Sequence, residues 1–137
     1  MATFECTSRT NYFRVTDEER YKELFGRLCS DGGDTLKDFT KEKDGIVYHG
    51  FGAYGCIDYR DDDDNYNIDI FFEEIQKIIP NNDAFVLMES GREGLRYVSG
   101  DAVIVTSKDI ISLSLANMVA AQLYKLLGEK YTPDLFY

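Results

Sequence analysis

The chain contains little of what membrane-spanning or disulfide-rich proteins are made of. It has no Trp, two Pro, one His and three Cys among 137 residues. No window approaches the roughly 18 consecutive apolar residues that a membrane span requires. The N-terminal residues show neither the cationic region nor the apolar run of a secretory signal. We therefore expect a cytoplasmic protein that makes no contact with a membrane.

The cysteines do not form a recognisable framework. Cys6, Cys29 and Cys56 are odd in number and lack CxxC spacing, and His49 is the only histidine that could accompany them. This pattern fits neither a disulfide scaffold nor a zinc site. We expect reduced thiols, no metal and no cofactor.

The apolar content is that of a folded protein. Hydrophobic residues make up 44% of the chain and aromatic residues 14%, which is too much for an acidic disordered segment. A chain of this length is usually one domain with one core. We expect a single globular domain over residues 1–137.

Hydrophobic periodicity predicts both helices and strands. Apolar residues at helical spacing predict helices over 16–28, 68–79 and 116–127. The first of these begins at a capping box formed by Thr16 and Glu19. The first helix should end in the glycine-rich stretch 30–34, and the last at Gly128. Strand-like runs cover 11–15, 36–43, 46–51, 53–59, 85–89, 95–98 and 102–106, with a hairpin turn at Asp44-Gly45. Residues 111–115 form either an edge strand or the lead into the last helix. The order predicts an α+β fold, a mainly antiparallel sheet with about three helices packed on one face.

Two motifs come close to ligand-binding signatures. Residues 50–55 match G-x-G-x-x-G, but the chain continues as a strand where a dinucleotide site needs a helix, so we interpret them as a glycine-rich strand with a bulge or a close backbone crossing. Residues 63–74 resemble a calcium loop, but Ile68 occupies the position that needs Gly. His49 lies in mid-strand without a partner nucleophile in sequence context, and we expect it to be half-buried. The sequence therefore predicts no enzymatic activity.

The negative charge is concentrated in one segment. Residues 58–74 contain eight acids and one base, so this 17-residue segment carries −7 of the net charge of −10. An extended run would place alternate carboxylates about 6–7 Å apart, a spacing comparable with that of phosphates along a nucleic-acid strand. Phe71 and Phe72 should lie in the core, whereas Tyr59 and Tyr66 could anchor an interface if exposed. The predicted partner-binding residues are Asp58, Tyr59, Asp61, Asp62, Asp63, Asp64, Tyr66, Asp69, Glu73 and Glu74.

Direct binding of nucleic acid is not expected. A net charge of −10 repels polyanions, and Lys37, Lys41 and Lys43 alternate with acidic residues along the chain. The charge distribution instead favours a basic partner protein.

Two segments carry a family resemblance. Residues 7–15 (TSRTNYFRV) and 95–106 (LRYVSGDAVIVT) resemble small uncharacterised proteins of bacterial phages, plasmids and other mobile elements. Acidic proteins of such elements often counter host defence by mimicking DNA, as some anti-CRISPR and anti-restriction proteins do. The resemblance implies this context but transfers no functional residue.

Three hypotheses follow for the function. The leading one is a non-enzymatic, nucleic-acid-mimicking inhibitor of a basic nucleic-acid-binding protein, such as a CRISPR effector or another defence nuclease. The second is a cytoplasmic immunity-type or housekeeping interaction protein that binds through an aromatic sheet face. The third is a small-ligand or calcium-binding module.

Overall fold

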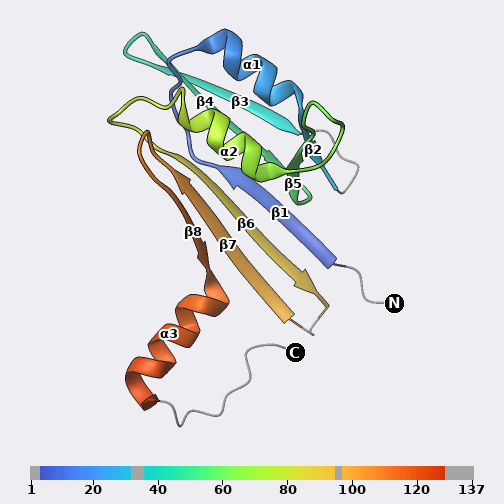
Figure 1. Ribbon diagram of the computed structural model, residues 1–137, viewed down its shortest axis with the longest axis vertical. Helices are drawn as coiled ribbons and strands as arrows, with labels where there is room; N and C mark the ends of the chain where they lie inside the picture. Colours follow the sequence, from blue (N-terminus) through green and yellow to red (C-terminus); the bar gives the residue numbers. More distant parts are fainter. Residues whose placement is uncertain (1–3, 32–35, 95–96, 129–137) are drawn as a thin grey trace.

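The computed structural model describes residues 4–31, 36–94 and 97–128 (Figure 1). Eight strands and three helices follow one another in these residues. The strands are β1 (Phe4–Thr10), β2 (Leu28–Ser30), β3 (Lys37–Lys43), β4 (Ile46–Ala53), β5 (Ile57–Tyr59), β6 (Phe85–Glu93), β7 (Tyr97–Val105) and β8 (Ile110–Ser114). The helices are α1 (Glu18–Gly26), α2 (Ile68–Gln76) and α3 (Leu115–Leu127). No helix in the described residues is both long and apolar enough to cross a bilayer.

Six strands form one antiparallel sheet in the order β3-β4-β1-β6-β7-β8, and β2 pairs with β5 in a separate ribbon. A hairpin joins β3 to β4, and two further hairpins join β6, β7 and β8. Strand β1 lies between these two groups and pairs with β4 and β6. The predicted α+β class with a mainly antiparallel sheet is confirmed.

The core lies between the sheet and two helices. Helices α1 and α2 cover one face of the sheet (Figure 1). Phe51 of β4 and Phe85 of β6 are fully buried on this face, and Phe71 of α2 packs against both, with ring centroids 6.2 and 5.7 Å away. Phe71 and Phe72 are therefore core residues, as the sequence predicts.

The third helix does not share this arrangement. Helix α3 extends from the end of β8 beyond the sheet, and none of its residues is buried (Figure 1). The first turn of α3 contacts the sheet face that lies opposite α1 and α2. There the side chain of Leu115 lies near Gly100 of β7. The expectation that all three helices pack on one face is therefore wrong for α3.

The start of the fold differs from the prediction. The first strand is residues 4–10 and not 11–15. Within 11–15, the Asn11 N–H donates to the Val86 carbonyl oxygen at 3.1 Å, and Phe13 exchanges two backbone hydrogen bonds of 2.8 Å with His49. The N-cap of α1 is Asp17, which accepts a hydrogen bond from the Arg20 N–H, and not Thr16. Strand β1 has few apolar residues, and its pairing with two neighbours determines its conformation.

The hairpin prediction is confirmed at Asp44-Gly45, where φ is 55° and 77°. The meander of β6, β7 and β8 is also present, but β6 continues to Glu93 through the residues expected to form a turn. Of the alternating residues 111–115, the first four belong to edge strand β8, and Leu115 is the first residue of α3. The predicted loop at 32–34 and the predicted strand start at 95 and 96 lie outside the described residues.

Candidate functional site

The acidic loop is a compact turn. The Asp61 carboxylate accepts hydrogen bonds from the backbone N–H groups of Asp63 and Asn65, both at 2.9 Å, and Asp64 adopts a positive φ of 60°. The turn is closed by a bridge between Arg60 and Tyr66. The expected extended run with regularly spaced carboxylates is therefore wrong, because the hydrogen bonds that the Asp61 carboxylate accepts turn the chain back on itself.

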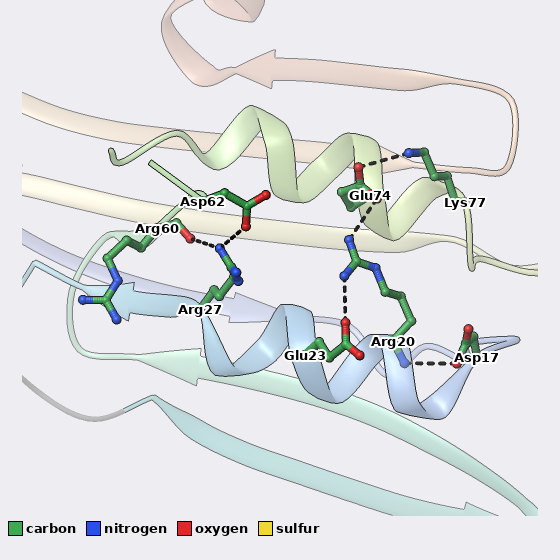
Figure 2. A network of polar contacts seen from close by, with 8 residues as sticks. All are labelled: Asp17, Arg20, Glu23, Arg27, Arg60, Asp62, Glu74 and Lys77. Atoms are coloured by element: carbon green, nitrogen blue, oxygen red, sulfur yellow. Dashed lines mark hydrogen bonds and ion pairs between the residues drawn. The ribbon is translucent and has the colours of Figure 1, made fainter. Parts of the chain in front are cut away.

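Cations from the helices neutralise part of the acidic segment (Figure 2). Arg27, just after α1, lies 2.7 Å from the carboxylate of Asp62. Glu74 of α2 pairs with Lys77 at 3.0 Å and with Arg20 of α1 at 3.2 Å. Hydrogen bonds from Lys77 and then Arg20 hold the pKa of Glu74 below its ordinary value. The same Glu74 is the last residue of the calcium-like segment, and its carboxylate is bonded to cationic side chains.

The other carboxylates keep their charge exposed or half-exposed. Asp64 has a loose contact of 3.8 Å with Arg60. The remaining five form no ion pair with a described residue: Asp58, Asp61, Asp63, Asp69 and Glu73. We call the eight acids of residues 58–74 the acidic surface.

The two tyrosines of this segment have different environments. Tyr59 of β5 is 4% exposed and packs against Phe71, with ring centroids 5.8 Å apart, so its predicted place at the interface is wrong. Pairing of β5 with β2 turns Tyr59 inward. Tyr66 is 65% exposed and remains available as an anchor.

A mixed-charge groove adjoins the acidic surface. Its volume is about 660 Å³, and it lies between α1 and the acidic loop. Arg20, Lys22 and Arg27 line it opposite Asp61, Asp62 and Asp63. Sequence reasoning did not place these cations near the acidic segment, because they are more than 30 residues away along the chain.

The expectation of three reduced thiols is wrong for two of them. Cys6 of β1 and Cys56, just before β5, form a disulfide with a Cα–Cα distance of 5.5 Å. The antiparallel pairing of β1 with β4 brings these positions together. Cys29 is a free cysteine, half-buried beside Asp58.

A carboxyl group faces the disulfide. Glu89 Oε2 lies 3.5 Å from Cys6 Sγ. Burial raises the pKa of Glu89 to about 7, a hydrogen bond with Ser8 opposes that rise, and the negative charge of Asp101 adds to it. Near neutral pH this carboxyl group is therefore partly protonated.

His49 is buried in β4. Its Nε2 lies 2.7 Å from the carboxylate of Glu18 at the start of α1, and its ring packs on Tyr21 with centroids 4.5 Å apart. Burial raises the pKa of the Tyr21 hydroxyl, which has no hydrogen-bond partner among the residues that the structure describes. The contacts of His49 with Glu18 and Tyr21 therefore hold α1 against the sheet.

The opposite face of the sheet carries a feature that the sequence analysis missed. In a strand, alternate side chains point to opposite faces. Register pairs Lys37 with Gly52, Phe39 with Gly50, and Lys41 with Tyr48. Asp38 pairs with core residue Phe51 and therefore points to the helix-covered face. The alternation of charge in the sequence thus places the lysines of β3 on one face and the acids on the other.

Aromatic rings and one arginine complete this face. The Arg9 guanidinium stacks 4.1 Å above the ring of Phe39. Tyr12 lies between Arg9 and Lys41, whose charged groups are 5.6 and 5.7 Å from the ring centroid. We call the following set the basic sheet face: Arg9, Lys37, Lys41 and Lys43 with Tyr12, Phe39 and Tyr48.

The glycine motif has its function here. A Cβ on Gly52 would lie 2.8 Å from the carbonyl oxygen of Ser8, so β1 and β4 approach too closely for a side chain. Arg9 and Tyr12 pack over the bare backbone of Gly52 and Gly50. The predicted close backbone crossing is confirmed.

Comparison with known proteins gives no match to a family model, to a curated protein or to a solved structure.

Proposed function

We propose that this protein is a non-enzymatic binding module whose acidic surface occupies a basic, nucleic-acid-binding site on a partner protein. The observation that carries this proposal is the group of five carboxylates in the acidic surface that have no ion pair with a described residue. A cationic groove built for phosphates would neutralise them. Exposed Tyr66 lies among them and supplies an aromatic anchor.

The partner class follows from charge and resemblance. A site that binds nucleic acid presents Lys and Arg side chains to phosphates, and carboxylates can replace those phosphates. The resemblance to small proteins of phages and plasmids adds a context in which the partner is a defence nuclease, such as a CRISPR effector.

The test removes only carboxylates that have no ion pair or capping role for their side chains. Immobilised wild type and an Asp63→Asn/Asp69→Asn/Glu73→Gln variant are exposed to a bacterial lysate, and bound proteins are then eluted with duplex DNA and identified. We expect DNA to elute basic nucleic-acid-binding proteins from the wild type and little from the variant.

The matched control carries the same change of charge elsewhere, at exposed Asp38, Glu42 and Asp109. The control should behave as the wild type does, because these residues lie outside the acidic surface. Equal DNA-elutable capture by wild type and the acidic-surface variant would contradict the proposal.

The apolar surface of β8 and α3 favours a second candidate, an interaction protein that binds through apolar contacts. Nine large apolar side chains there are exposed: Ile110, Ile111, Leu113, Leu115, Met118, Val119, Tyr124, Leu126 and Leu127. An isolated helix as short as α3 is marginal in water, so contact with another surface would stabilise it. Salt separates the candidates, because rising salt weakens binding through the acidic surface and leaves apolar binding unweakened.

A further inference from the structure

We propose that the basic sheet face binds single-stranded nucleic acid. The face lies on the side of the sheet away from α1 and α2, and within the described residues no helix covers its β3–β4–β1 part (Figure 1). It is therefore separated from the acidic surface by the sheet and the core.

The first argument is charge. Lys37, Lys41 and Lys43 share this face of β3, all exposed, and Arg9 of β1 lies beside them. From Lys37 to Lys43 the strand spans about 20 Å, so its lysines can follow several phosphates of an extended strand. The acids Asp38 and Glu42 between them point to the other face.

The second argument is the flat surface between the cations. Arg9 is held against the ring of Phe39, so its guanidinium is already oriented before a phosphate arrives. Tyr12 is 39% exposed, and Tyr54 at the edge of the face is 70% exposed. A hollow of about 350 Å³ lies between Arg9, Lys37, Phe39 and Tyr54.

These features together favour a nucleic acid over an acidic peptide. Proteins that hold single strands combine a cationic path for the backbone with aromatic or guanidinium surfaces on which bases stack. A polyglutamate chain would use the cations but could not stack on the rings. A duplex would use the cations too, but its bases are already stacked on one another.

The net charge of −10 does not prevent this binding. The acidic surface lies on the other side of the core, and at physiological ionic strength exposed charges are screened beyond about 8 Å. A phosphate on the basic sheet face is close to four cations and is separated from the acidic loop by the sheet and the core.

The test is fluorescence anisotropy of a labelled oligo-dT or oligo-U strand, titrated with protein at several salt concentrations. Lys37→Gln/Lys41→Gln is compared with Lys108→Gln/Lys125→Gln, a control with the same change of charge at exposed positions elsewhere. We expect wild type and control to bind. In the basic-face variant, the slope of log affinity against log salt should become shallower by about 1.4, because each phosphate contact to a single strand contributes about 0.7.

A Tyr12→Leu variant tests stacking separately and should weaken binding about tenfold without changing the salt slope. Circular dichroism confirms that each variant is folded. The proposal is wrong if wild type gives no anisotropy change at low salt, if the two lysine variants bind alike, or if duplex or polyglutamate competes as well as unlabelled oligo-dT. Because these variants leave the acidic surface intact, failure here is distinguishable from failure of the proposed function.

Discussion

Glu89 shows how burial changes a single residue. The sheet places its carboxyl beside the Cys6–Cys56 disulfide and gives it no ion pair with a described residue. The nearby charges that affect it most are acids, so the ionised form is disfavoured in the folded protein. The folded state therefore binds a proton at this position more tightly than the unfolded state does.

This gives a prediction for the pH dependence of stability. The pKa of Glu89 is raised from 4.5 to about 7 in the folded protein. Protonation of Glu89 therefore stabilises the folded state fully below pH 4.5, and this stabilisation is lost as pH rises through 7. Glu89→Gln should therefore unfold at higher denaturant than wild type at pH 8, with the difference shrinking or reversing near pH 5. Urea unfolding at pH 5 and pH 8 measures the difference in stability between the variant and the wild type. The same difference at both pH values would contradict the raised pKa of Glu89. Glu42→Gln, exposed on β3, is the control.

Gly52 is a residue that the packing of two strands requires. An added Cβ would meet backbone at 2.8 Å, and backbone cannot move aside as a flexible side chain can. We expect Gly52→Ala to lower the free energy of unfolding by about 1–3 kcal/mol. Gly26→Ala, where an added Cβ meets nothing within 4 Å, should be neutral or stabilising. Chemical unfolding of both variants decides, and equal stabilities would show that β1 and β4 can separate slightly.

At the scale of elements, local signals in the sequence predict local structure well. The Asp44-Gly45 turn forms as expected because its two residues tolerate the positive φ that the hairpin needs. Strand β1 could not be predicted in the same way, because its sequence FECTSRT has weak strand character and its conformation depends on pairing with β4 and β6.

The candidate surfaces were only partly visible in the sequence for the same reason. The concentration of acids is a property of the sequence, but the arginines that neutralise Asp62 and Glu74 come from another element. The charge sorting on β3 was present as an alternation of Lys37, Asp38 and Phe39, and it could have been recognised by applying the two-residue period of a strand to charge as well as to hydrophobicity.

The disulfide links β1 to the segment between β4 and β5. Cys6 and Cys56 are separated by 50 residues, and closing a loop of this length restricts the unfolded chain. We expect Cys6→Ser/Cys56→Ser to lower the free energy of unfolding by about 2–4 kcal/mol. Cys29→Ser, at the free cysteine, should change it much less. Chemical unfolding without reductant measures both losses, and equal losses would show that the link between Cys6 and Cys56 contributes nothing specific.

At the scale of the whole molecule, the two surfaces make the charge distribution strongly uneven. The acidic segment carries −7, and the opposite sheet face gathers four cations. The net charge alone suggests uniform repulsion of all polyanions. The fold instead exposes one surface with an excess of negative charge and another with an excess of positive charge.

The last prediction follows from crowding of like charge on the acidic surface. Its exposed ion pairs contribute little, typically 0 to about 1 kcal/mol each, and salt weakens them. Repulsion among the carboxylates without ion pairs acts in the opposite direction, and salt screens it as well. Because repulsion involves more groups than pairing here, we expect the melting temperature to rise as sodium chloride increases from low to physiological concentration.

The Asp63→Asn/Asp69→Asn/Glu73→Gln variant should melt higher than wild type at low salt and gain less from added salt. The Asp38→Asn/Glu42→Gln/Asp109→Asn control has the same net charge, so an equal response of both variants in calorimetry would mean that only total charge matters and that the acidic surface has no local excess of repulsion.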